Sequence, residues 1–113
     1  MVAVTQPITI ETGTDFAQGF QLRQGAKSTD LLADLAGGSG RAQLRTQAGG
    51  DLLATFAVEI DPGQSLVWLR LSHALTAALL AEKAVYDCIY TDASGIETRI
   101  VQGAATIIRS VTE

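Results

Sequence analysis

Apolar and polar residues alternate along most of this chain, and a period of two residues is typical of β-strands with one buried face. The clearest example is Arg41-Ala42-Gln43-Leu44-Arg45, in which every second side chain is apolar. The other segments predicted as strands are residues 8–10, 15–23, 52–60, 65–71, 85–90, 96–101 and 104–111. The pattern therefore predicts an all-β protein.

Turn and loop signals separate these strands. Ala48-Gly49-Gly50-Asp51 indicates a hairpin, because glycine tolerates the mirror-image turns that hairpins use. Asp61-Pro62-Gly63-Gln64 has the Pro and Gly positions of a type II turn. The polar, glycine-rich residues 24–40 predict a loop that places Leu32 and Leu35 in the core.

One short helix is expected among the strands. Ser72 is a suitable N-cap for residues 73–82, in which Leu75 and Leu79 are four positions apart and share a face. This segment connects the strand at 65–71 to the C-terminal part of the chain.

We expect the rest of the fold to be built around the stretch from Ala84 to Glu113. Two strand-like runs meet at the turn Asp92-Ala93-Ser94-Gly95, and a third apolar run follows Gly103, which predicts a three-stranded meander. Such a unit needs a second layer to bury its apolar face. The sequence thus predicts an antiparallel β-sandwich of about seven or eight strands with one short helical crossover. The alternation places five large side chains in its core: Phe20, Leu44, Phe56, Leu69 and Ile100.

Composition limits the class of protein. The 113 residues suit a single domain, 1–113, with residues 1–6 as a flexible lead-in, and 47% of them are hydrophobic. A net charge of −4 argues against nucleic-acid or anionic membrane partners. No signal peptide or long apolar segment is evident and there is one cysteine, so we expect folding in the cytoplasm.

Groups that carry chemistry are few. His73 is the single histidine, and no base accompanies Cys88, which we interpret as a buried, inert thiol. Zinc-type clusters of Cys and His are absent, and residues 92–95 are better explained as a turn than as a calcium loop. We therefore expect no catalytic residue, no metal site and no cofactor.

Trp68 is the most informative single residue. In the strand at 65–71, Leu66, Trp68 and Arg70 share the face opposite to the one expected to contact the core. Exposed Trp beside Leu and Arg is typical of interface cores, whereas burial under the loop 24–40 explains the same pattern without a partner. The final strand, with Arg109 as its one charge, looks like an open edge. The candidate interface residues are Leu66, Trp68, Arg70, Ile107 and Arg109.

Several short motifs follow one another in a recognisable order from about residue 8 to residue 112. They are Gly13-Thr14-Asp15-Phe16, Asp34-Leu35-Ala36-Gly37, Arg41-Ala42-Gln43-Leu44-Arg45, Tyr86-Asp87, Asp92-Ala93-Ser94-Gly95, Arg99, Gln102-Gly103 and Val111-Thr112. In this order the chain resembles small proteins and modules encoded among the tail and baseplate genes of tailed bacteriophages. It departs from them at Gly38, where an aromatic residue is common, and at Glu82-Lys83, where a glycine is usual.

The resemblance implies an immunoglobulin-like β-sandwich and a structural role in a virion, in the tail, baseplate or neck, without enzyme activity. It also implies other virion proteins or further copies of the chain as partners, and assembly into a virion made in the host bacterial cytoplasm. The alternative is a carbohydrate-binding or cell-surface adhesion sandwich, in which Trp68 would stack on sugars together with Tyr86 or Tyr90.

Overall fold

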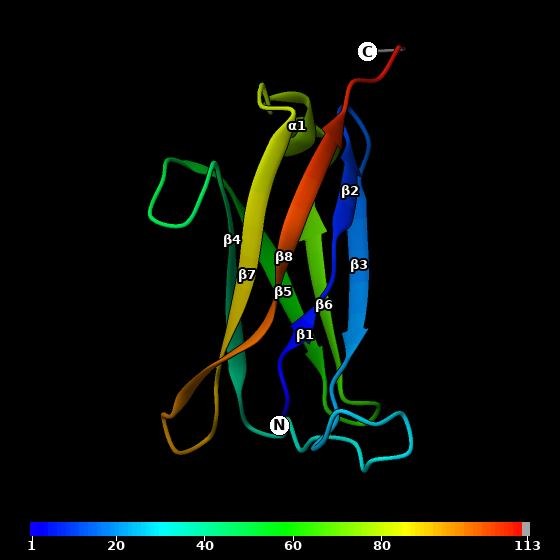
Figure 1. The fold of residues 1–113 in the computed structure, drawn as a ribbon, viewed down its shortest axis with the longest axis vertical. Coiled ribbons are helices and arrows are strands. Elements are labelled where there is room, and N and C mark those ends of the chain that lie inside the picture. Colours follow the sequence, from blue (N-terminus) through cyan, green and yellow to red (C-terminus); the bar gives the residue numbers. More distant parts are fainter. Residues whose placement is uncertain (112–113) are drawn as a thin grey trace.

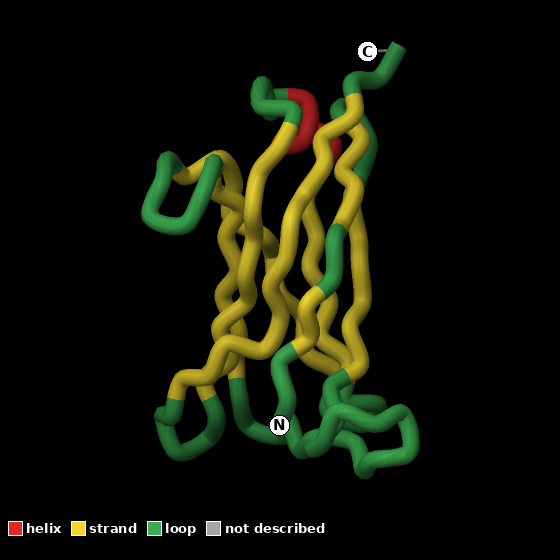
Figure 2. Tube along the Cα trace, viewed as in Figure 1, coloured by secondary structure: helices red, strands yellow, loops and turns green. Residues whose placement is uncertain are grey.

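The computed structural model describes residues 1–111 and consists of β-strands with one short helix, as Figures 1 and 2 show. The elements are β1 (Val4–Thr5), β2 (Ile8–Glu11), β3 (Phe16–Gln21), β4 (Ser39–Arg45), β5 (Leu52–Asp61), β6 (Leu66–Leu71), α1 (His73–Ala77), β7 (Lys83–Thr91) and β8 (Glu97–Ile108). The all-β prediction is confirmed.

The strands follow one continuous path in the order β1-β8-β7-β4-β5-β6-β3, with β2 also paired to β8. The long strand β5 forms the corner of this path, because its first half pairs with β4 and its second half, from Ala57, pairs with β6. Two layers result, β4, β7 and β8 against β6 and β3 (Figure 1). The arrangement is nearly a barrel, and it remains open between β2 and β3.

Within the expected lead-in at 1–6, Val4 and Thr5 form β1 and belong to the sheet. Strands β1 and β2 both run parallel to β8, so the fold is not purely antiparallel. Gln6 and Pro7 link these two strands, and the Tyr86 hydroxyl donates a hydrogen bond of 2.6 Å to the Gln6 carbonyl. Gly103 lies directly beneath, where any Cβ would collide with that carbonyl.

The predicted three-stranded meander is wrong. Strand β8 runs without interruption from Glu97 to Ile108, so the C-terminal unit is one long hairpin of β7 and β8. Gly103 reads as a break in the sequence, but it pairs with Tyr86 inside the strand and gives room to the Gln6 carbonyl. Strand β8 is flanked by β7 and by β1 and β2, so the expectation of an open edge there is also wrong.

Helix α1 is shorter than predicted. The Ser72 side chain accepts from the Leu75 amide at 3.3 Å, which confirms the expected cap. The helix ends at Ala77, and Leu75 is 48% exposed while Leu79 is buried. Thr76 is the buried residue of the helix and donates to the Thr14 carbonyl at 2.7 Å, so a polar contact anchors a helix that was expected to pack through leucine.

The core is largely as predicted. All five expected residues, Phe20, Leu44, Phe56, Leu69 and Ile100, are buried, and Phe16 and Tyr86 complete an aromatic cluster in which ring centroids lie 5.9–6.3 Å apart. Two leucines depart from the pattern: Leu32, which was expected in the core, is exposed, and so is Leu52, which strict alternation along residues 52–60 places on the same face as Phe56.

Both departures have local causes. Leu32 forms an isolated bridge with Arg23, and the next residue, Ala33, turns inward beside the buried Leu35. A register shift in the β4–β5 ladder, between Leu44 and Arg45, breaks the alternation that would have carried Leu52 to the core face.

Candidate functional site

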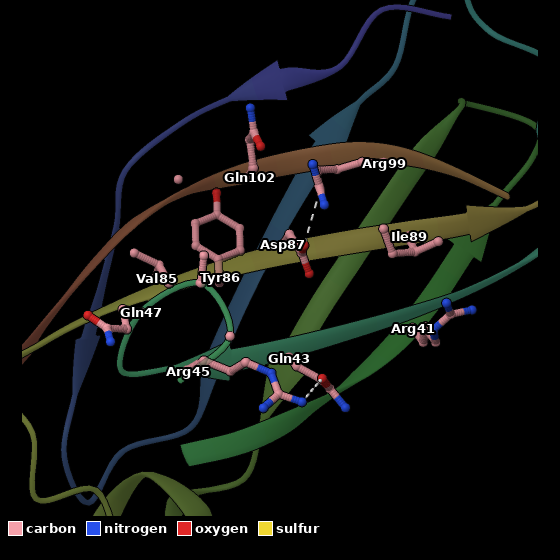
Figure 3. Close-up of a pocket in the computed structure, with 13 residues that line it drawn as sticks. Arg41, Gln43, Arg45, Gln47, Val85, Tyr86, Asp87, Ile89, Arg99 and Gln102 are labelled. Atoms are coloured by element: carbon pink, nitrogen blue, oxygen red, sulfur yellow. Dashed lines mark hydrogen bonds and ion pairs between the residues drawn. The ribbon is translucent and has the colours of Figure 1, made fainter. Parts of the chain in front are cut away.

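A groove runs over the outer face of β4, β7 and β8 and forms an open hollow of about 610 Å³ (Figure 3). Inward side chains of these strands build the core, so the alternate ones line the groove. Pairing aligns the outward residues in three rows across the sheet: Arg41–Ile89–Arg99, Gln43–Asp87–Gln102 and Arg45–Val85–Ala104.

One end of the groove is closed by the turn of the β4–β5 hairpin. Gln47, Ala48 and Gly49 line this end. The turn is held by hydrogen bonds from the Thr46 amide to the Asp51 carbonyl at 3.0 Å and from the Gly50 amide to the Gln47 carbonyl at 2.8 Å. Gly49 has φ +74°, a conformation that favours glycine, so the predicted Gly-Gly hairpin is confirmed and shapes the site.

Positive charge predominates in the groove. Three of the eight basic residues of this acidic chain, Arg41, Arg45 and Arg99, line it with one carboxylate, Asp87. Arg99 contacts Asp87 at 3.2 Å, and Arg41 pairs at 2.6 Å with Glu97 beside the groove. The hydrogen bonds and opposite charge of Arg41 hold the pKa of the Glu97 carboxyl below its usual value.

Of the three arginines that line the groove, Arg45 is the one with no ion pair to a carboxylate of residues 1–111. Its guanidinium donates to the Gly50 carbonyl at 2.9 Å and to the Gln43 Oε1 at 2.8 Å, and both acceptors are neutral. These bonds hold the side chain along β4, on one side of the groove, and Figure 3 shows the bond to Gln43. A fixed guanidinium presents a fork of donors that suits a carboxylate or another planar anion.

The arrangement is suited to recognition. Arginine and glutamine side chains supply hydrogen-bond donors around the apolar Val85 and Ile89, the mixture found in protein contact surfaces. Cys88 points into the core beneath the groove, where burial raises the pKa of its thiol to about 12. Within residues 1–111, no three His, Cys, Asp or Glu side chains gather as a metal site.

Three of the predicted interface residues lie on the other layer of the molecule. Leu66, Trp68 and Arg70 share the outer face of β6, and Val67, Leu69 and Leu71 are buried, so the predicted orientation of this strand is confirmed. The Trp68 side chain is half-buried.

Two neighbours cover part of the Trp68 ring. A Cβ added to Gly19 on β3 would lie 3.1 Å from it, and the Arg70 guanidinium carbon lies 4.9 Å from its centroid. Arg70 also contacts Glu59 at 3.3 Å, which neutralises its charge on this face.

The other two predicted interface residues do not join this surface. Ile107 is buried, because it is in phase with Ala105 on the inner face of β8, and Ile108 is the outward neighbour. The Arg109 guanidinium donates to the Leu79 carbonyl and so ties the end of β8 to the segment after α1. Ile107 is therefore corrected to a core residue.

The groove itself was not predicted. Its residues come from strands far apart in the sequence, and an alternating pattern does not reveal which strands pair or in what register. The sequence did contain one signal. Arg41, Gln43 and Arg45 alternate with apolar residues, and Asp87 and Arg99 occupy polar positions of other strands, so these side chains face away from the core.

The remaining polar and aromatic candidates lie elsewhere. Tyr86 and Tyr90 are both buried, so neither provides a stacking surface beside Trp68 as the carbohydrate-binding alternative requires. His73 is exposed at the start of α1, where its Nδ1 lies 2.9 Å from the Asp15 carboxylate.

A comparison of the chain with protein-family models and with curated protein sequences finds no match in either. Within residues 1–111, no helix has the length and apolar character needed to cross a membrane.

Proposed function

We propose that this chain is a non-enzymatic structural protein of a tailed-bacteriophage virion. It acts as an assembly adaptor in the tail, baseplate or neck, and contacts other virion proteins or further copies of itself. The observation that carries the proposal is that the polar residues of the resembling strand motifs line one surface.

These motifs divide into two groups. Asp34, Gly37, Asp92 and Gly95 shape turns: Asp34 accepts from the Ala36 amide, Asp92 from the Ser94 amide, and both glycines have positive φ. The polar members of the strand motifs line the groove instead, namely Arg41, Gln43, Arg45, Asp87, Arg99 and Gln102. A pattern that combines turn formation with one shared surface fits a scaffold that presents a contact site.

The strand order supports the immunoglobulin-like classification within this proposal. In that fold one sheet contains the second, fifth and fourth strands and the other contains the third, sixth and seventh. Counting β1 and β2 as the first strand, the neighbours β3-β6-β5 and β4-β7-β8 have this order, and a helical turn precedes β7. The N-terminal strand lies beside β8 instead of β3, and β5 joins the sheets at one corner.

The charge of the groove indicates the chemistry of the partner segment. Three arginines face a single lining carboxylate, and Arg45 has neutral acceptors, so the groove complements a segment that carries carboxylates. We expect an acidic loop or strand of a neighbouring virion protein to dock there.

Mass spectrometry of purified particles from the phage that encodes this chain tests the proposal. We expect the chain among the structural proteins in several copies per particle. Capture by purified neighbouring virion proteins is expected to weaken on replacing Arg45 and Arg99 by alanine, whereas Arg70→Ala on the other layer serves as the matched control. A particle that lacks the chain refutes the proposal.

A further inference from the structure

Within residues 1–111, four strand segments have a backbone edge that pairs with no other strand: β1, which has two residues, β2, β3 and the second half of β5. Exposed edges pair readily with other strands, and proteins protect them with charged residues or proline. Strand β2 follows Pro7 and ends at Glu11, and the β5 segment carries Glu59 and Asp61. Strand β3 reads Phe-Ala-Gln-Gly-Phe-Gln and has neither a charge nor a proline. It is therefore the longest unprotected edge, and the first contact on its outward side comes after the strand, where the Val2 amide donates to the Arg23 carbonyl at 3.2 Å.

The backbone groups of β3 that point away from the sheet can be assigned. The Leu22 amide, just after β3, donates to the Ser65 carbonyl beside β6 at 2.9 Å. Hydrogen-bonding direction alternates along a strand, so every second residue before Leu22 also faces β6. The amides and carbonyls of Ala17, Gly19 and Gln21 face outward. Strand β2 does not pair with β3, and a hollow of about 260 Å³ lies between them.

We infer that β3 pairs antiparallel with β3 of a second copy of this chain, around a twofold axis at Gly19. The three outward-facing residues then match: Gly19 bonds with Gly19, and Ala17 bonds with Gln21 of the other copy. Because opposed residues have the same parity, their side chains lie on the same face. The core faces of both copies therefore share one side of a continuous sheet.

The surroundings of Gly19 favour this occupant. The six-membered part of the Trp68 ring extends from β6 over Gly19, toward the free edge. Two glycines that meet at the axis leave the outer face free of side chains between the two indoles. Arg70 is paired with Glu59, so the charges that flank Trp68 are balanced. Trp68 and Leu66 thereby join the interface for which they were candidates.

This inference goes beyond the proposed function and rests on backbone geometry and strand composition alone. A chain that stays monomeric overturns the inference and leaves the virion role untouched. Conversely, a chain that dimerises through β3 but is absent from particles retains the inference and loses the proposed function.

The test compares two double variants at the same positions. In the inferred register residue 17 of one copy lies opposite residue 21 of the other, so Ala17→Lys with Gln21→Glu creates two symmetric ion pairs. Ala17→Lys with Gln21→Lys creates two like-charge pairs. We expect the dimer dissociation constants to differ by about tenfold or more between the two variants, measured by sedimentation at several concentrations. Ala57→Lys, on the outer face but away from β3, is the control and leaves dimerisation unchanged.

The quenching of Trp68 fluorescence gives a second readout, because Trp68 is the sole tryptophan. Its accessibility to a soluble quencher is expected to fall as the wild-type protein dimerises. Circular dichroism and thermal unfolding establish that each variant is folded. Three results would each overturn the inferred pairing. The first is a wild-type protein that stays monomeric at all concentrations, and the second is equal dissociation constants for the two double variants. The third is protection of β3 only when a foreign protein is added.

Discussion

Two buried tyrosines on β7 place their hydroxyl groups in contrasting surroundings. The Tyr86 hydroxyl donates to the Gln6 carbonyl and so anchors the link between β1 and β2. The Tyr90 hydroxyl lies against Gly38 and has no hydrogen-bond partner within residues 1–111. Burial raises the pKa of both phenols, to about 12 for Tyr86, so both are protonated near neutral pH.

Replacing these tyrosines by phenylalanine is expected to have different effects. Tyr86→Phe leaves the Gln6 carbonyl unpaired and should reduce the free energy of unfolding by about 1–2 kcal/mol. Tyr90→Phe removes an unpaired hydroxyl and should leave stability equal or slightly increased. Chemical denaturation of the two variants measures the difference, and a larger loss for Tyr90→Phe would contradict these assignments.

The aromatic cluster gives a second prediction at this scale. Phe56 is buried and packs against Phe16 and Tyr86. Phe56→Ala should cost about 3–5 kcal/mol, through lost burial and the cavity left behind. That is a large part of the 5–15 kcal/mol typical of small domains. Ala57→Gly, at an exposed position next to it, is the comparison, and an unfolding midpoint unchanged by Phe56→Ala would show that the cluster does not stabilise the fold.

At the scale of elements, alternation predicted the strands well because each side chain is set by its own position in the pleat. Phe20, Leu44 and Leu69 were therefore placed in the core from sequence. The failures arise where a segment distant in the sequence determines the local structure. The Gln6 carbonyl explains why residue 103 is a glycine inside a strand, and Thr14 anchors α1 through Thr76. The groove depends on pairing register for the same reason, which local patterns do not contain.

Helix α1 has a second anchor that predicts a dependence on pH. The Asp15 carboxylate accepts from the His73 amide at 2.7 Å and from its ring, and these bonds hold the pKa of Asp15 below its usual value of 3.8. A lowered pKa in the folded state stabilises the fold above about pH 3.8, and this contribution is lost as pH falls through the lowered value.

A carboxyl NMR titration measures this dependence. We expect a midpoint for Asp15 below 3.8, with the His73 amide signal shifting over the same range. Asp15→Asn should abolish the shift of the His73 amide and leave the rest of the spectrum unchanged. A midpoint at or above the usual value would contradict the anchoring role.

At the scale of the whole molecule, the two proposed contact surfaces lie on different layers. The arginine groove covers β4, β7 and β8, whereas the free edge and Trp68 belong to β3 and β6. A pair of copies joined through β3 therefore leaves both grooves open to other proteins. This division would allow one small domain to hold its own copies together and to bind a neighbour, as the proposed adaptor role requires.

A map of the intact particle with this chain fitted tests the central claim, the role as a virion adaptor, most directly. The account predicts density for the fold in the tail, baseplate or neck, with the groove covered by an acidic segment of a neighbouring protein. Arg45 would then lie within hydrogen-bond distance of a carboxylate from that neighbour. A particle without this density, or one in which the chain is present and the groove faces solvent in every copy, would contradict the account.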